Sequence, residues 1–353
     1  MHTKVDWQLF APALLISLAG LATMNSFSID EHFFSKQVIW LILSVVIFFI
    51  TSAFDWKFLG RTRVLVTLFL ITVFVLLLLF VLGHASHGAQ SWFSFGGLAF
   101  QPSDPAKIVA VLILAKYFSR RHIEIANVRH IIVSGVYAFI IALLVFLQPD
   151  FGGAVIIFGI WFGMVLVSGI SKRHLLAVIG IACVSVALLW VFAFAPYQKA
   201  RILTFIHPLT DIRGAGYNAY QSTIAVGSGQ ILGKGIGLGS QSKLLFLPEY
   251  QTDFIFAAFA EEWGFVGTIL LLTLVLVLLM RVIDNARRAG NNFEAFFGLG
   301  VAMLWGMHIL IHAGMNMGVL PVTGIVFPFM SYGGSHLLTE FFVLGVLSSM
   351  CKD

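Results

Sequence analysis

The chain has 353 residues, of which 59% are apolar and only 10% are charged, and its mean hydropathy is +0.97. A soluble domain carries about 25% charged residues, so this composition excludes an ordinary soluble protein and predicts a chain that lies mostly in lipid. The formal net charge of +5 is modest. We attribute it to unequal charge on the two sides of a membrane, and we expect no nucleic acid partner.

Membrane-crossing helices need about 20 mostly apolar residues each. The sequence predicts ten spans, near residues 8–27, 37–54, 64–83, 105–119, 131–147, 152–169, 174–195, 254–282, 294–315 and 333–350. Ten spans place both ends of the chain on one side of the membrane. We therefore predict an all-α polytopic membrane protein, with residues 1–353 forming a single transmembrane domain.

The distribution of basic residues predicts which face of the protein is cytoplasmic. Of the 21 Lys and Arg residues, five lie in a long loop over residues 196–252, between spans 7 and 8, and only Lys36 and Lys107 share its face. The other fourteen lie on the face of the termini: Lys4, Lys57, Arg61, Arg63, Lys116, Arg120, Arg121, Arg129, Lys172, Arg173, Arg281, Arg287, Arg288 and Lys352. Short basic loops stay in the cytoplasm, so both termini are expected to be cytoplasmic and the long loop extracytoplasmic.

The first two unusual segments of the outer face follow spans 3 and 5. Residues 84–107 contain Gly-rich turns and aromatic residues, and then a helix start at Ser103-Asp104-Pro105. Asp104 and Lys107 are three residues apart, so they share a helical face; they are either a binding pair or a cap and a snorkelling lysine. Asp150, in the segment QPDFGG, is either a turn former or part of a site.

Two later segments add polar groups to the same face. The Gly-rich part of the long loop is expected to be flexible or re-entrant, and its backbone N–H groups, with Arg201, Lys234 and Lys243, suit an anionic phosphate. Residues 316–335 contain two prolines, four glycines and the polar Ser331. Irregular backbone at membrane depth is tolerated where it lines a cavity or is buried in protein. Together the outer segments predict a cavity that opens outward.

Asp253 is the central candidate of that cavity. It stands where the chain enters the eighth span, and Glu261 and Glu262 follow deeper in the same helix. A carboxylate in a membrane span is costly unless it is paired or faces water, so it indicates a functional site. The alternative is structural: Thr252 or Asp253 would form the N-cap of the helix. We expect Glu261 to be structural or to support Asp253 without touching substrate, and Glu262 to point elsewhere.

The outer segments resemble the signature blocks of the SEDS family (shape, elongation, division and sporulation proteins). The matching blocks are FQPSDPAK (100–107), QPDFGG (148–153), GAGYNAYQS (214–222), GLGSQSKLLFLPEYQTDFIFAAFAEEWG (237–264) and LPVTGIVFPFMSYGGS (320–335). They occur in the family's order and span nearly the whole chain. The form GSQSKLLFLPE resembles the RodA branch, which serves side-wall growth and rod shape, more than the FtsW branch, which serves division.

The resemblance implies a peptidoglycan glycosyltransferase of the bacterial cytoplasmic membrane. Such an enzyme polymerises lipid II into β-1,4-linked glycan strands at the outer face, together with a class B penicillin-binding protein that cross-links them. The family's essential aspartate falls on Asp253, and its conserved lysine on Lys107. The chain departs from the family pattern at several positions, where other residues are usual: Ser91, Asp104, Pro105, Gly153 and Gln251.

For this reaction we expect Asp253 to act as the general base that takes the proton of the attacking hydroxyl. The candidates for substrate binding are Asp104, Lys107, Asp150, Arg201, Lys243 and Ser331, of which Lys107, Arg201 and Lys243 would stabilise the departing pyrophosphate. A divalent cation, Mg²⁺ or Mn²⁺, would suit the same purpose, although the sequence shows no metal-ligand spacing. Two alternatives stay open: a lipid II flippase, and a non-catalytic scaffold for the cross-linking enzyme.

Overall fold

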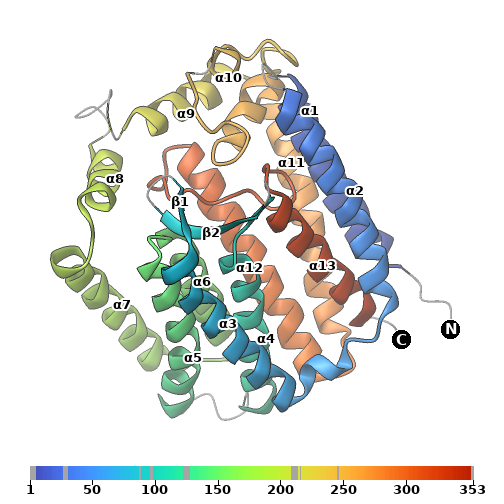
Figure 1. The fold of residues 1–353 in the computed structure, drawn as a ribbon, viewed down its shortest axis with the longest axis vertical. Helices are drawn as coiled ribbons and strands as arrows, with labels where there is room; N and C mark the ends of the chain where they lie inside the picture. The colour runs from blue at the N-terminus through green and yellow to red at the C-terminus, as the bar shows by residue number, and fades with distance from the viewer. Residues whose placement is uncertain are drawn as a thin grey trace.

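The computed structural model of the protein describes residues 5–26, 31–86, 89–95, 98–121, 128–207, 214, 216–244 and 246–350. Ten long helices form its body (Figure 1): α1 (Trp7–Ser26), α2 (Glu31–Ala53), α3 (Thr62–Leu82), α4 (Ser103–Arg121), α5 (Val128–Leu147), α6 (Phe151–Val167), α7 (Lys172–Phe192), α11 (Ile255–Arg287), α12 (Asn292–Asn316) and α13 (Gly334–Met350). Each predicted span overlaps one of these helices, which confirms the all-α polytopic fold.

The helices differ in how well they match a membrane span. Within the described residues, seven are long and apolar enough to cross a bilayer, and α6 and α13 are shorter apolar helices of 17 residues each. The remaining one, α4, has 19 residues and carries charges at both ends, among them Asp104, Lys107 and Lys116. Charges inside a span are costly unless they are satisfied by the protein, so α4 is expected to be surrounded by other helices.

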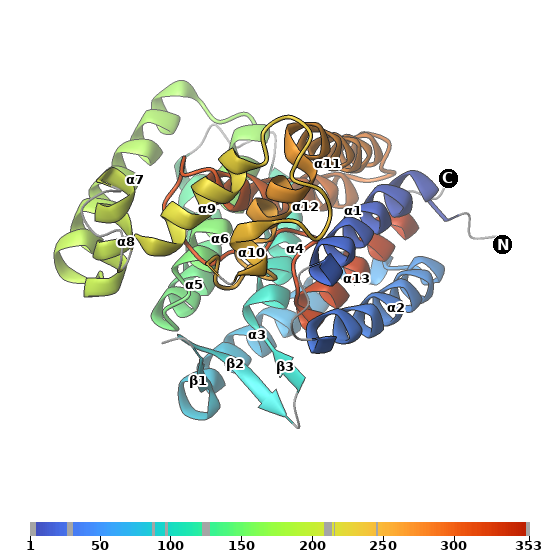
Figure 2. The same cartoon turned by 90° about the horizontal axis from the view of Figure 1, so that it is seen from above.

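The packing agrees with that expectation. α12 runs through the middle of the bundle and packs against α4, α6 and α11, while α13 packs along α2 and α1 packs against α11 (Figures 1 and 2). The core between them is rich in large aromatic side chains, such as the fully buried Phe118, Phe297 and Trp305. By contrast, α7 lies at the edge of the bundle and exposes Leu176 and Phe192, an outward surface as apolar as lipid tails.

Three helices that are distant in sequence are joined at one end of the bundle. The Arg281 Nε of α11 donates to the Asp6 carboxylate at 2.9 Å, and the Asn285 Nδ2 donates to the same carboxylate at 2.8 Å. The backbone N–H of Asp6 donates to the Ser348 Oγ, near the end of α13. The beginning of α1 and the end of α13 therefore lie at the same face, as an even number of spans requires.

A small antiparallel sheet, which the sequence did not predict, lies between α3 and α4. It consists of β1 (His84–Ser86), β2 (Ala89–Phe95) and β3 (Leu98–Phe100) in the order β1-β2-β3, with Phe93 opposite Phe100. We expected Gly-rich turns here because glycines and polar residues dominate the segment. The aromatic residues of β2, which favour an extended backbone, explain the difference.

The long loop between α7 and α11 is partly helical in its described residues. It contains α8 (Pro196–Ile206), α9 (Tyr217–Ser228) and the short α10 (Ser240–Lys243). The Gly-rich segment 229–237 packs directly against α11, where the Lys234 N–H donates to the Glu261 carbonyl at 3.0 Å and the Gly235 N–H to the Glu262 carbonyl at 3.1 Å. The segment therefore supplies backbone partners to α11.

The segment 229–237 contacts α11 where that helix is interrupted. Gly264 has φ 65° and ψ −166°, which no residue inside an α-helix adopts, and Phe265 donates its N–H across the break to the Gln230 carbonyl at 2.8 Å. We expected an unbroken span here. The break is stable because the loop replaces the hydrogen bonds that the helix loses.

The close approach at this break predicts a large effect of one methyl group. Gly233 has φ +82°, and a Cβ atom there would collide with the Glu262 carbonyl and with the Gly264 nitrogen. We expect Gly233→Ala to destabilise the protein by about 1–3 kcal/mol or more and to lower the thermal unfolding midpoint in detergent. Gly227→Ala in α9 is the control, because a Cβ there meets nothing within 4 Å. Equal midpoints for the two variants would contradict the packing described.

Candidate functional site

Asp253 lies half-buried just before the first residue of α11. The structure corrects the proposed N-cap: α11 begins at Ile255, and its N-cap residue is Phe254, whose side chain makes no capping hydrogen bond. Asp253 is therefore placed in the turn that leads into the helix. The helix N-terminus still faces this turn, and its dipole favours a negative charge there.

Asn316, at the end of α12, fixes the backbone of this turn. Its Nδ2 donates to the Asp253 carbonyl at 3.0 Å and to the His312 carbonyl at 2.8 Å. Its Oδ1 accepts from the Ala257 N–H at 3.1 Å, in the first turn of α11. Asn316 is fully buried, so these bonds join α11 to α12 in a place that water does not reach. Asn316 is the first residue of the segment 316–335, which the sequence predicts to have an irregular backbone.

Ser331 holds the other side of the same turn. Its Oγ donates to the Thr252 carbonyl at 2.8 Å and accepts from the Phe327 N–H at 2.8 Å. The neighbouring Tyr332 N–H donates to the Gln251 carbonyl, also at 2.8 Å. We expected Ser331 to bind substrate; in this structure its hydroxyl is used within the protein, where it positions the residues beside Asp253.

The irregular segment 320–333 passes directly beside the carboxylate. A Cβ atom built on Gly324 would lie 3.5 Å from the Asp253 Oδ2, and Gly324 has φ +72°. That backbone conformation favours glycine, so the segment combines close approach to Asp253 with a turn that few other residues would adopt. The side chains of Asn316 and Ser331 thus hold the backbone of the turn, and Gly324 lies beside the Asp253 carboxylate.

Asp104 and Lys107 form a buried ion pair near the start of α4. The Lys107 Nζ lies 2.9 Å from the Asp104 Oδ1, and their side chains are only 6% and 5% exposed. On the other side, the His336 Nδ1 lies 3.1 Å from the Asp104 Oδ2, and the His336 Nε2 lies 3.0 Å from the Glu340 Oε1. These last two contacts have ion-pair distances without hydrogen-bond geometry. Glu340 also accepts the Phe329 N–H at 2.6 Å.

This buried charge cluster contains two carboxylates, one lysine and one histidine: Asp104, Glu340, Lys107 and His336. It is electrically neutral when His336 carries a proton on both ring nitrogens. The cavity that these residues line, together with His308, has a volume of about 20 Å³, far below the several hundred cubic ångströms of a ligand pocket. In this conformation Lys107 therefore faces a closed cluster and not an open chamber.

Sequence reasoning missed His336 and Glu340, although a signal was present. Glu340 is a lone carboxylate in the apolar run of α13, and His336 precedes it by four residues, so the two share one face of the helix. A carboxylate within a span is by default a candidate site residue. His308 was missed as well; its ring lies 5.5 Å, centroid to centroid, from that of His336.

The other three predicted residues lie in different surroundings. Asp150 caps α6: its Oδ1 accepts the Gly153 N–H at 2.7 Å and its Oδ2 accepts the Ser103 Oγ at 3.2 Å. It thereby ties the start of α6 to the start of α4. Arg201 is exposed on α8, with its guanidinium 5.8 Å from the Tyr197 ring. Lys243 is exposed on α10 and donates to the Gly237 carbonyl at 3.3 Å.

Glu261 and Glu262 both have structural roles in this fold. Glu261 forms an ion pair with Lys234, which we expected to bind an anionic phosphate. The Lys234 Nζ lies 2.6 Å from the Glu261 Oε1, which also accepts the Gln241 N–H. Glu262 accepts from the Ser26 Oγ at 2.8 Å, at the end of α1, and from the Gly237 N–H of the loop. Both carboxylates hold the long loop against α11.

The described residues contain no group of three or more His, Cys, Asp or Glu side chains arranged to hold a metal ion. A magnesium ion in an enzyme of phosphate chemistry needs only one or two protein carboxylates, because water and substrate oxygens supply the rest. Asp253 is one carboxylate of that kind.

The fold and these buried carboxylates define a polytopic helical membrane protein with an acidic turn at the end of a span. The chain belongs to the FtsW, RodA and SpoVE family, described as cell cycle proteins, whose sequence profile matches residues 5–353.

Its relatives cover most of the chain. The peptidoglycan glycosyltransferase MrdB of Escherichia coli K12 is 38% identical over 80% of this chain and 76% of its own, and the stage V sporulation protein E of Bacillus subtilis is 33% identical over 99% and 98%. Among solved structures, the rod shape determining protein RodA of Thermus thermophilus superposes with a TM-score of 0.73 at 29% identity, over 98% of this chain and 96% of that one. A chain from a study of how a peptidoglycan synthase complex coordinates polymerisation and crosslinking reaches 0.84 at 29% identity, over 99% and 98%.

Proposed function

We propose that this protein is a peptidoglycan glycosyltransferase that polymerises lipid II at the outer face of the bacterial cytoplasmic membrane during cell elongation. The names of its relatives support the reaction. The observation that carries the proposal is the turn at Asp253, where Asn316 and Ser331 fix the backbone on both sides of a carboxylate. A general base must be held within hydrogen-bonding distance of the proton that it takes, and the hydrogen bonds of this turn hold Asp253 in a fixed place.

In the proposed reaction, the 4-hydroxyl of one sugar attacks the anomeric carbon of the other substrate. A new C1–O4 bond forms, the bond from C1 to the pyrophosphate oxygen breaks, and the hydroxyl proton passes to Asp253. An α-linked pyrophosphate thereby becomes a β-1,4 linkage, so the displacement inverts the anomeric centre. Because undecaprenyl pyrophosphate is already a good leaving group, no carboxylic acid is needed to protonate it, unlike in glycosidases.

The departing pyrophosphate requires positive charge. We propose that Arg201 and Lys243, exposed on α8 and α10, meet the substrate at the rim. Lys107 would contribute once the buried charge cluster opens toward the turn, with Asp104 orienting the lysine, and Asp150 would support them by keeping α4 and α6 together. A divalent cation, Mg²⁺ or Mn²⁺, would supply further positive charge.

We also propose a class B penicillin-binding protein as the partner, which the structural relative from a polymerising and crosslinking complex supports. The orientation follows from charge: the face that carries Arg281, the beginning of α1 and the end of α13 would be cytoplasmic, and the turn at Asp253 would face outward. Both termini are then cytoplasmic, and the long loop meets the partner and the substrate outside.

One observation favours the alternative of a lipid II flippase. The interrupted helix α11 resembles the discontinuous helices that many transporters place at their binding sites. A transporter would place its charges near the middle of the membrane, between matching halves. Here Asp253 and its anchors lie at the end of a span, so we favour glycosyl transfer.

The deciding experiment uses the purified protein with its penicillin-binding partner and fluorescent lipid II. We expect glycan strands that lysozyme digests, visible on a gel when the partner's transpeptidase is blocked. The same protein in vesicles should leave the distribution of lipid II between leaflets unchanged. Transfer of lipid II across the vesicle membrane without strand formation would establish the flippase. If the partner alone formed strands at the same rate, this chain would be a non-catalytic scaffold.

A further inference from the structure

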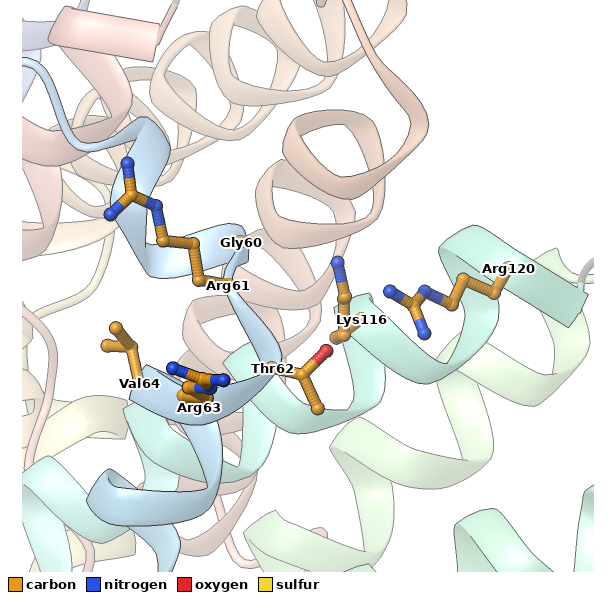
Figure 3. A pocket seen from close by; sticks show the side chains of 7 residues that line it. All are labelled: Gly60, Arg61, Thr62, Arg63, Val64, Lys116 and Arg120. Atoms are coloured by element: carbon orange, nitrogen blue, oxygen red, sulfur yellow. The ribbon is translucent and has the colours of Figure 1, made fainter.

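A wide basic pocket lies at the opposite end of the bundle from Asp253. It is formed where η1 (Lys57–Gly60) meets the start of α3 and where α4 ends, and its volume is about 580 Å³. Figure 3 shows its lining, with Arg61 and Arg63 on one wall and Lys116 and Arg120 on the other. This volume is within the range of small-molecule binding pockets.

The four basic side chains of this pocket have no acidic partner among the described residues. Other basic residues of the same face do have one: Lys57 lies 3.7 Å from Asp55, and Arg288 lies 2.8 Å from Asp284. Like charges that share a concave surface repel each other and raise the local concentration of anions. The four basic residues of the pocket therefore differ from these paired basic residues of the same face.

The wall formed by Lys116 is firmly placed. The Lys116 Nζ lies 5.9 Å from the centre of the Phe293 ring, at the start of α12, and Gly60 packs against the same ring. In Figure 3 the Arg120 guanidinium points toward Lys116. Phe293 of α12 therefore contacts both walls of the pocket, Gly60 on one side and Lys116 on the other.

The start of α3 adds backbone donors to the side chains. Its N-cap residue, Arg61, has an extended backbone, and its side chain makes no capping hydrogen bond. The first N–H of the helix that donates to the Arg61 carbonyl is that of Leu65. The N–H groups of the first turn belong to Thr62, Arg63 and Val64, which line the pocket. Free N–H groups at a helix start bind phosphate well when cations stand beside them.

The surroundings of the pocket indicate what kind of phosphate it would take. One turn or more along α3, Val66 and Leu70 are 52% and 60% exposed, in a helix of membrane-spanning length. A ligand with its phosphate in the pocket could therefore lay an acyl chain along α3. A soluble phosphate would leave this apolar surface unused.

We propose that the pocket lined by Arg61, Arg63, Lys116 and Arg120 binds the phosphate head group of an anionic membrane lipid. The lipid belongs to the leaflet on that side, which is cytoplasmic in the orientation proposed above. The head group neutralises the cations, and its acyl chains cover α3. This site is separate from the turn at Asp253, and the proposal does not depend on the glycosyltransferase reaction.

The test compares Arg63→Gln with Arg120→Gln, combined, against a control of equal charge loss, Lys57→Gln with Arg288→Gln. Native mass spectrometry of the purified protein with phosphatidylglycerol or phosphatidylcholine measures lipid binding. We expect wild type and control to bind phosphatidylglycerol equally and in preference to phosphatidylcholine. The pocket variant should bind it about 30-fold more weakly, since each cation near a membrane surface contributes about a factor of five.

Three results would overturn the proposal. Equal weakening in the control would show a general effect of surface charge, and equal binding of both lipids would show no recognition of charge. Displacement of the lipid by millimolar inorganic phosphate, with phosphate alone bound as tightly, would assign the pocket to a soluble anion. The double variant Arg63→Lys with Arg120→Lys is the control for misfolding. It keeps both positive charges and should retain most of the lipid binding.

Discussion

Asp253→Asn is expected to lower glycan-strand formation by about 10²–10⁴-fold, the usual contribution of a general base. Asparagine has the shape of aspartate and can form the same hydrogen bonds to backbone N–H groups, but it cannot accept the proton of the attacking hydroxyl. The backbone anchors at Asn316 and Ser331 do not involve the carboxylate, so the turn should persist. The measurement is the rate of strand formation by the purified complex, with the unfolding midpoint and partner binding recorded alongside.

The matched control is Asp284→Asn at the other end of α11. Asp284 pairs with Arg281 and Arg288 and is 37% exposed, so the same chemical change occurs on the same helix away from the site. We expect its rate to stay within about twofold of wild type, because exposed ion pairs contribute little. Normal strand formation by the Asp253 variant would remove Asp253 as the base and direct the search first to Asp104.

Lys107→Met is expected to cost about 3–5 kcal/mol of stability, because it leaves the Asp104 carboxylate buried without its nearest cation. The double variant Asp104→Leu with Lys107→Met removes both charges and leaves His336 paired with Glu340. It should therefore regain most of the lost stability. Unfolding midpoints of the two single variants and the double variant form a cycle that measures the coupling.

The same variants separate a structural role from a role in substrate binding. If Lys107 contacts the pyrophosphate, the double variant should be stable and yet poorly active, with a raised apparent KM for lipid II. A double variant with wild-type activity would confine Asp104 and Lys107 to the structure of the protein. A stable single variant Lys107→Met would contradict the buried pair itself.

The sequence predicted the ten spans because each is an apolar run of nearly the length that a bilayer demands. It also indicated Asp253 and the pair Asp104–Lys107, because charged residues in such runs are rare enough to need a reason. Resemblance to a family then supplied the reaction. These predictions rest on local patterns, which one stretch of chain carries by itself.

Other features depend on partners that are far apart in the chain. Asn316 joins α12 to Asp253 and Ala257, about 60 residues away. In the sequence alone, an asparagine at this position indicates only the end of a helix. His336 meets Asp104 only because α13 packs near α4. Gly264 lies inside the predicted span 254–282, and the break there depends on the backbone of segment 229–237.

The break at Gly264 makes the long loop a part of α11. The N–H groups of Phe265 and Val266, just after the break, donate to the Gln230 and Ile231 carbonyls of the loop, and the Glu261 and Glu262 carbonyls, just before it, accept from Lys234 and Gly235. The piece before the break, residues 255–263, is also bonded to α12 through Asn316. A displacement of segment 229–237 is therefore expected to displace α11 on both sides of the break, including the short piece that follows Asp253.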